Sequence, residues 1–204
     1  MLIDQSFRNL LDAFSSSDPT PGGGSASALA AAVGAALLAM VAGLPKTRGG
    51  TAEDRAALGP ARDALLALRD ELATLVDRDT SAYDQVVAAY RLPKATDEEK
   101  ASRSAAIQRA MRQAIDTPLA VMRACEVTAR HGEAVARHGN PSASSDVKVG
   151  LELLGAGLRG ARLNVEINLG SVKDEAYVAR VKHDVETLAA ALDGATARGR
   201  TLLV

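Results

Sequence analysis

The 204-residue chain has few residues of the kinds that form disulfides, aromatic stacking platforms and metal sites. It has one cysteine, no tryptophan, two phenylalanines and three tyrosines, so no disulfide can form within it. Cys125 lies among apolar residues, which favours a small buried side chain over a nucleophile. The three histidines lack the spacing from partner acids that a metal site needs, so we expect no bound metal.

Charge of one sign is also lacking, because the net charge is −1 and acidic and basic residues are interspersed. Without a basic face or stacking aromatics, we expect no nucleic-acid partner. The first five residues lack the basic region and apolar core of a signal peptide, which favours a cytoplasmic protein. The one long apolar stretch, residues 26–44, is mostly alanine, and this composition favours a buried helix over a membrane span, so we expect no membrane partner.

Apolar periodicity predicts an almost entirely helical chain. The expected helices cover about 7–17, 25–44, 51–92, 96–115, 118–138, 146–169 and 173–198. Two starts stay open: the third helix begins after Gly50 or at Pro60, and Pro118 either starts a helix or kinks a continuous one. Residues 163–169 alternate like a strand, but a lone strand would have no pairing partner. We therefore expect an all-α antiparallel multi-helix bundle, with residues 1–204 forming a single domain.

A glycine run precedes the alanine-rich helix. Gly22, Gly23 and Gly24 permit backbone conformations closed to other residues and let a ligand approach the main chain closely. Ser25 is then expected to cap the helix, whose free N–H groups suit a carboxylate or an electron-rich heteroatom. The alternative is a plain linker with a helix cap.

Polar residues interrupt two apolar stripes. Asp79 lies in the middle of the apolar face of the third helix, where it is either paired, for example with Arg78, or a proton-transfer residue. Asn164 and Asn168 are four residues apart and share a helix face. Such amides either bond to neighbouring helices or bind a heterocycle with alternating donors and acceptors, such as a pterin.

Three further residues are weaker candidates. Asp146 is expected to cap its helix, and Asn140, between a glycine and a proline, is expected in a turn. Lys94 follows Leu92-Pro93 at the end of the third helix and is either a solvated lysine or, if it folds back toward Asp79, one member of an acid/base pair.

Together these segments resemble a known family. The resemblance is carried in order by Pro19-Thr20-Pro21-Gly22-Gly23-Gly24-Ser25, Asp79 with Ala82-Tyr83, Leu92-Pro93-Lys94 with Thr96 and Glu98-Glu99-Lys100, Gly139-Asn140, Ser145-Asp146, Asn164-Val165 with Ile167-Asn168, and Asp174. The chain is thereby similar to the formimidoyltetrahydrofolate cyclodeaminase/methenyltetrahydrofolate cyclohydrolase family over nearly its whole length. Tyr83 stands where phenylalanine is common in that family. The resemblance implies an all-α homodimer that acts on folate-bound one-carbon units.

The implied chemistry needs one group to remove a proton and one to deliver it to a departing nitrogen, with no cofactor beyond the tetrahydrofolate-derived substrate. The resemblance places Asp79 and Lys94 in those roles, with Asp146 as a second carboxylate. Substrate binding is assigned to Gly22, Gly23, Gly24, Ser25, Tyr83, Asn140, Asn164 and Asn168.

The resemblance does not decide between two reactions that would use the same pocket. Cyclodeaminase is slightly favoured, methenyltetrahydrofolate cyclohydrolase is the alternative, and a non-catalytic helical dimer or folate-binding protein is the third. A polyglutamyl folate would also need cations at the pocket rim, for which Lys46, Arg48 and Arg91 are candidates.

Overall fold

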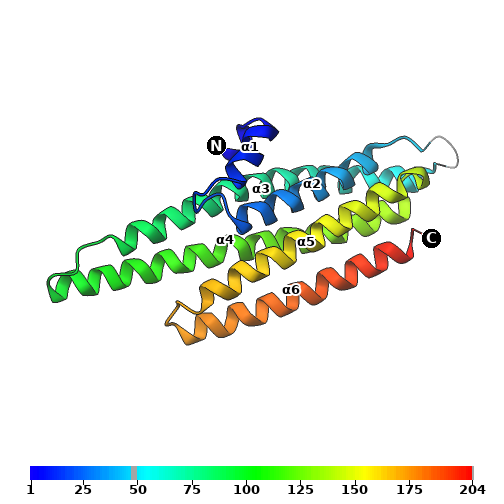
Figure 1. Ribbon diagram of the computed structural model, residues 1–204. Helices are drawn as coiled ribbons and strands as arrows, with labels where there is room; N and C mark the ends of the chain where they lie inside the picture. Colours follow the sequence, from blue (N-terminus) through cyan, green and yellow to red (C-terminus); the bar gives the residue numbers. More distant parts are fainter. Residues whose placement is uncertain (47–49, 204) are drawn as a thin grey trace.

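A computed structural model describes residues 1–46 and 50–203, and over these residues it contains helices and no strand (Figure 1). The all-α expectation is confirmed, and the alternating segment 163–169 is helical. The α-helices are α1 (Phe7–Phe14), α2 (Gly23–Gly43), α3 (Ala52–Tyr90), α4 (Asp97–His138), α5 (Ser144–Leu169) and α6 (Glu175–Thr201); the short 3-10 helices are η1 (Leu2–Asp4) and η2 (Pro141–Ala143).

The helices form an elongated bundle in which α3 and α4 make a long antiparallel hairpin (Figure 1). α2 packs against α3 and α5, while α4 packs against α3, α5 and α6. The buried core runs along these contacts and is dominated by leucine, valine and alanine, including the fully buried Leu38, Leu72 and Leu154. Burial of each such leucine contributes on the order of 2 kcal/mol.

Small residues bring α2 and α5 into close contact. A Cβ added at Gly34 would lie 2.8 Å from the carbonyl oxygen of Gly150, and one added at Gly157 would lie 2.8 Å from the Cβ of Ala31. This explains the alanine-rich composition, since larger side chains would push the two backbones apart. α2 is long and apolar enough to cross a membrane, yet more than half of its most apolar window is buried within the bundle.

The structure decides where the helices around Pro60 and Pro118 begin. α3 begins after Thr51, whose side chain forms a capping box with Asp54, so Pro60 lies inside the helix and does not start it. α4 is continuous through Pro118, and Thr96 caps it as expected. Two cap predictions are wrong: Gly22 is the N-cap of α2, not Ser25, and Ala143 is the N-cap of α5, not Asp146.

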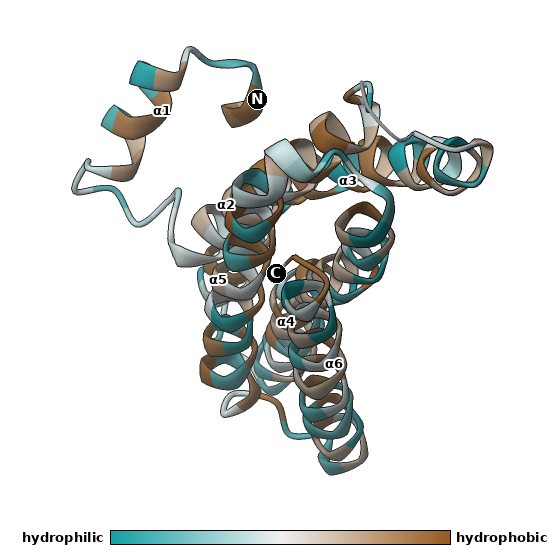
Figure 2. Cartoon of the chain, turned by 90° about the vertical axis from the view of Figure 1, so that its right-hand side faces the viewer, coloured by the Kyte–Doolittle hydropathy of each residue, from teal (hydrophilic) through white to brown (hydrophobic). Residues whose placement is uncertain are grey.

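Two parts of the architecture extend beyond the tightly packed helices. α2 begins partway along the bundle, so α3 and α4 extend beyond its N-terminus and form an open end (Figure 1). α1 stands outside the bundle on the side of α2 and α5 (Figure 2). The Phe7 side chain of α1 is 71% exposed, so the apolar side of this helix is not fully covered within one chain.

Candidate functional site

Asp79 of α3 meets the first turn of α2. Its Oδ2 accepts a hydrogen bond from the backbone N–H of Ser25, with 2.8 Å between nitrogen and oxygen. The first N–H groups of a helix have no acceptor within the helix, and here a carboxylate from another helix supplies one. Because the N-cap residue Gly22 has no side chain, Asp79 takes the role that Ser25 was predicted to have.

The hydroxyl of Ser25 adds a second contact to the same carboxylate. Ser25 Oγ lies 2.8 Å from the carbonyl oxygen of Val76 and 3.1 Å from Asp79 Oδ2. A hydroxyl has one proton and cannot donate to both acceptors at once. When that proton goes to Val76, the contact with Asp79 is a hydrogen bond only if Asp79 is protonated. The arrangement therefore suits a carboxyl group that gains and loses a proton.

Burial acts in the same direction on Asp79. The pKa of this carboxyl is raised above its ordinary value because desolvation disfavours the charged form, and the hydrogen bonds from Ser25 only partly oppose this effect. Arg78, the expected ion-pair partner, lines a different cavity, between α3 and α4. Asp79 is thus held by Ser25 without a neutralising cation among the described residues.

Gly24 explains why the glycine run is needed. A Cβ added at Gly24 would overlap Asp79 Oδ1, so any larger residue would displace the carboxylate. The other side of the run faces α5, because a Cβ at Gly23 would lie 3.6 Å from Asn164 Nδ2. The N-terminus of α2 is therefore flanked by a carboxylate on one side and an amide on the other.

The two asparagines of α5 have different environments. Asn164 Nδ2 donates to the carbonyl of Gly160 within its own helix, at 2.9 Å, and the amide oxygen of Asn164 takes no part in this hydrogen bond. Asn168 Nδ2 donates to the carbonyl of Ala114 in α4, at 3.0 Å. Asn164 thus belongs to the group around the glycine run, whereas Asn168 also ties α5 to α4. Tyr83 lies one turn beyond Asp79 on α3 and is 40% exposed.

Lys94 does not share a cavity with Asp79 in this chain. It lines a separate cavity of about 470 Å³ at the open end, together with Tyr90, Lys100, Arg103 and residues from the α5–α6 connection. The helix from Asp79 to Tyr90 rises about 16 Å before the chain reaches Lys94. The two members of the predicted acid/base pair are therefore not brought together within one chain.

Asp146 and Asn140 lie at the opposite end of the bundle. Asp146 is in the first turn of α5, and the rise from Asp146 to Asn164 is about 27 Å. Asn140 is in a turn, as expected, where its side chain donates to the carbonyl of Pro45 and accepts from the N–H of Ser142. The predicted residues thus lie in three separate places: around the glycine run, at the open end of the bundle with Lys94, and at the opposite end with Asp146 and Asn140.

The candidate rim cations are also dispersed. Lys46 pairs with Asp54 at 3.1 Å, Arg91 is exposed just after α3, and Arg48 lies outside the described residues. The cavity of Lys94 is also lined by Lys100, which belongs to one of the segments that carry the family resemblance but was given no role, and by Arg103 and Lys173, which sequence reasoning missed. Sequence reasoning also missed Thr80, whose buried hydroxyl, next to Asp79 in sequence, has no partner among the described residues. No sequence signal distinguished Arg103, Lys173 and Thr80 from ordinary surface and helix residues.

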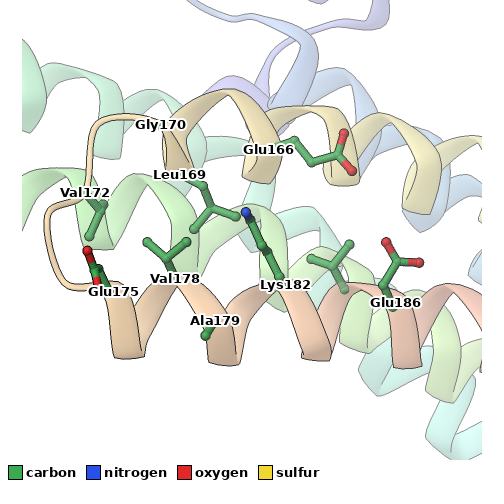
Figure 3. Close-up of a pocket in the computed structure, with 10 residues that line it drawn as sticks. Glu166, Leu169, Gly170, Val172, Glu175, Val178, Ala179, Lys182 and Glu186 are labelled. Atoms are coloured by element: carbon green, nitrogen blue, oxygen red, sulfur yellow. The ribbon is translucent and has the colours of Figure 1, made fainter.

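A larger cavity, of about 910 Å³, lies between the end of α5 and the start of α6 (Figure 3). Its walls carry Glu166, Glu175, Glu186 and Lys182 around an apolar floor that includes Leu169 and Val178. None of the predicted site residues is among its lining residues. The largest of the cavities described here therefore contains none of the predicted site residues.

Comparison with known proteins decides the family. A sequence model of the family described as formiminotransferase-cyclodeaminase matches residues 6–187. This chain belongs to the formiminotransferase-cyclodeaminase family. The methenyltetrahydrofolate cyclohydrolase of Methylorubrum extorquens is 40% identical over 190 residues, which cover 93% of this chain and 91% of that relative.

Other members of the formiminotransferase-cyclodeaminase family share the sequence or the fold. The rat formimidoyltransferase-cyclodeaminase is 32% identical over 92% of this chain, although the match spans only 35% of that longer protein. The formiminotetrahydrofolate cyclodeaminase of Thermotoga maritima has a solved structure that matches all of this chain and 98% of that one, with a TM-score of 0.89 and 26% identity. The expected family resemblance is confirmed.

Proposed function

We propose that this chain is an enzyme of folate one-carbon metabolism whose reacting group binds between Asp79 and Asn164, at the N-terminus of α2. The carboxyl of Asp79 carries the proposal, because it is half-buried, has a raised pKa and lies against a glycine-lined helix end. The amide oxygen and nitrogen of Asn164 offer both kinds of hydrogen bond that a pterin ring needs. The proposal requires only the tetrahydrofolate-derived substrate, and it includes no metal ion and no further cofactor.

The proposed chemistry passes through a tetrahedral carbon between two nitrogens. In the cyclohydrolase direction, Asp79 removes a proton from water as the water oxygen attacks the methenyl carbon, and then delivers that proton to the departing ring nitrogen. As the carbon–nitrogen bond breaks, the remaining hydroxyl proton is released to solvent and the carbon–oxygen double bond of the formyl group forms. A carboxyl whose pKa is raised by burial above that of an ordinary aspartate suits both transfers. The first-turn N–H groups of Gly23 and Gly24 have no acceptor within α2 and are available to an electron-rich substrate atom.

Cyclohydrolase activity is the primary proposal, and cyclodeaminase activity is the second. The first is supported by the 40% identity to a methenyltetrahydrofolate cyclohydrolase of similar length. The second is supported by the structural match to a stand-alone cyclodeaminase. Sequence alone slightly favoured the cyclodeaminase. We further propose that the protein works in the cytoplasm.

Two assays separate these activities. The purified protein is mixed with methenyltetrahydrofolate while its absorbance is followed, and separately with formimidoyltetrahydrofolate while ammonia is measured. Catalysed loss of methenyl absorbance without ammonia release from the second substrate is the result expected for a cyclohydrolase. Ammonia release with methenyl formation identifies a cyclodeaminase. Folded protein that is inactive in both assays contradicts the proposal.

We also propose that the protein is a homodimer formed through the outer face of α2 and α5. Exposed apolar side chains follow this face along both helices, namely Val33, Met40, Val149, Leu163 and Ile167. α1, with its exposed Phe7 and Leu11, projects on the same side (Figure 2). Burial of apolar surface of this kind on a second copy removes it from water and favours association.

A dimer of this kind also explains why the predicted site residues are dispersed. Val149 and Ile167 mark the two ends of the apolar face, about 27 Å apart along α5. A two-fold axis crossing the middle of α5 would pair opposite ends. It would bring Asp146 of the partner subunit toward Asn164, so that the second predicted carboxylate reaches the site from the other chain.

A further inference from the structure

The side chain of Thr80 differs from the neighbouring hydroxyl side chains of α3. Its Oγ1 is buried and has no hydrogen-bond partner among the described residues. Serine and threonine hydroxyls inside a helix commonly donate to the carbonyl four residues earlier. Thr74 donates in this way to the carbonyl of Asp70, at 3.0 Å, and Ser81 to that of Asp77, at 3.1 Å. The missing bond at Thr80 therefore has a local cause.

The carbonyl that Thr80 would bond already has two donors. This carbonyl belongs to Val76, and within the α-helix it accepts the backbone N–H of Thr80. It also accepts from Oγ of Ser25, which comes from α2 and lies 2.8 Å away. A carbonyl oxygen has two lone pairs, so these two donors fill it. The Thr80 hydroxyl is thus without a partner because Ser25 has taken its usual acceptor.

The Ser25 hydroxyl has a second acceptor in reach, since Asp79 Oδ2 lies 3.1 Å away and Ser25 is fully buried. When Asp79 is ionised, its carboxylate is a stronger acceptor than a carbonyl, and the Ser25 proton turns toward it. One lone pair of the Val76 carbonyl is then free. Threonine populates two χ1 rotamers in helices, so Thr80 can rotate and donate to this carbonyl. The Thr80 hydroxyl therefore has a partner when Asp79 is ionised and lacks one when Asp79 is protonated.

Charged groups on the surrounding elements make other contacts. Gly23–Gly43 of α2 contains no charged residue, and Arg78 of α3 lines the cavity between α3 and α4. Four carboxylate or guanidinium groups of the neighbouring elements have partners of their own: Asp4 with the N-terminal ammonium, Asp77 with the N–H of Leu2, Asp116 with Tyr177, and Arg162 with Glu186. The proton on Asp79 is therefore governed by burial and by Ser25, and through Ser25 by Thr80.

We propose that Thr80 is a positioning residue that favours the ionised form of Asp79, acting through Ser25 and the Val76 carbonyl. This inference rests on the proposed function, in which Asp79 must release a proton as well as bind one. The Thr80 hydroxyl gains a hydrogen bond only when Asp79 is ionised, so it offsets part of the cost of burying the carboxylate. Thr80 thereby affects the reaction only through Asp79.

An NMR titration of Asp79 tests the proposal without turnover. Isotope-labelled aspartate lets each carboxyl group be followed, and Asp79→Asn identifies the signal. Thr80→Val keeps the shape and removes the hydroxyl, so the pKa of Asp79 should rise further by about 0.5–1 pH unit, as expected for one net hydrogen bond. Thr80→Ser restores the donor and should return the pKa to its wild-type value. Thr74→Val removes an equivalent hydroxyl from the same helix and should leave the titration of Asp79 unchanged.

Three results would overturn the proposal. The first is an unchanged titration of Asp79 in Thr80→Val. The second is a shift that Thr80→Ser does not reverse, which would indicate a packing effect of the altered side chain. The third is a shift of the Asp77 signal alone, since Asp77 Oδ2 is the other buried side-chain atom without a partner in the described part of the chain. That result would make Asp77 the acceptor of the Thr80 hydroxyl.

Kinetics separate this inference from the proposed function. In an active enzyme, the limb of the kcat/KM profile that depends on Asp79 should move upward in Thr80→Val by the same amount, about 0.5–1 pH unit, and return in Thr80→Ser. A shifted titration of Asp79 in a protein that turns over neither folate substrate would keep the assignment of Thr80 and reject the proposed function. Turnover that depends on Asp79, with a titration that Thr80→Val leaves unchanged, would do the reverse.

Discussion

Asp79 of α3 caps α2, because its Oδ2 accepts the N–H of Ser25 at 2.8 Å. One carboxyl group thereby has two roles in the proposal, since it accepts one of the free N–H groups of a helix end and lies beside the glycine run that is proposed to bind substrate. The cap holds Asp79 in one position without a cation, which leaves its pKa raised. Stability and proposed chemistry therefore depend on the same residue.

Replacement of this carboxyl should remove activity and leave the fold intact. Asp79→Asn keeps an oxygen that can accept the N–H of Ser25 but cannot exchange a proton, so we expect kcat/KM to fall at least about 100-fold while the helical circular dichroism is unchanged. Asp84→Asn, on the exposed side of the same helix, is the matched control and should retain activity. Wild-type rates in Asp79→Asn would exclude the proton-transfer role.

The raised pKa of Asp79 should be visible in stability as well as in rate. The folded state binds the proton more tightly than the unfolded state, so the stabilising effect of protonation is present at low pH and is lost as pH rises through the raised pKa. Thermal unfolding from about pH 4 to pH 7 should show the wild type losing stability relative to Asp79→Asn. The kcat/KM profile should likewise have a limb above the ordinary aspartate pKa that the variant lacks; parallel stability curves would contradict this prediction.

Gly24→Ala should disrupt the site through a direct collision. The new methyl group would overlap Asp79 Oδ1 and force the carboxylate or the α2 backbone to move. We expect a loss of stability of about 1–3 kcal/mol together with a loss of activity. Gly170→Ala, where the added Cβ would meet its nearest atom, the carbonyl oxygen of Ile167, at an ordinary contact distance of 3.8 Å, should instead change stability by less than about 1 kcal/mol. Denaturant unfolding measures the free energy of unfolding of both variants. An equal loss of stability in the two variants would be inconsistent with a specific collision at Gly24.

Asp54 should govern acid stability at the other end of the bundle. Its carboxylate accepts from the N–H of Thr51 at 3.0 Å and also contacts His138 Nδ1 and Lys46 Nζ, and these hydrogen bonds hold its pKa well below the ordinary value. The stabilisation is present above the unfolded-state pKa and is lost as pH falls below it. The melting temperature of the wild-type protein should fall below about pH 4. Asp54→Asn should have a lower melting temperature than the wild type at neutral pH, but its melting temperature should fall less on acidification. An equal acid slope in both proteins would contradict this assignment.

The proposed dimer should dissociate when charge is placed on the face of α2 and α5. Leu163 and Ile167 are 66% and 77% exposed in the single chain, so Leu163→Glu/Ile167→Glu should fold normally as a monomer. If Asp146 of the partner subunit completes the site, this monomer should also lose activity. Sedimentation measures the mass, with Thr187→Glu on the exposed side of α6 as the control. A wild-type protein that sediments as a monomer would overturn the proposal.

The helices were predictable because apolar spacing and capping residues are local signals. Thr96 caps α4 as its sequence motif indicates, and the period of the apolar residues predicts every long helix. The Ser25 cap was mispredicted because a cap supplied by another helix leaves no local pattern. The cavity of Lys94 was missed for the same reason, since Lys94, Arg103 and Lys173 lie near one another only after α3, α4 and the α5–α6 connection have packed.

Residue types and short-range spacing were enough to establish the all-α class, the family resemblance and the presence of a carboxylate within an apolar stripe. They suffice because local spacing sets backbone hydrogen bonding and the faces of helices. The meeting of Asp79 with Ser25 and Gly24, the separate position of Lys94, and the far position of Asp146 and Asn140 emerged only from the folded chain. Contacts between distant residues depend on which helices pack together and in what register, and the packing of α2 against α3 and α5 sets that register here.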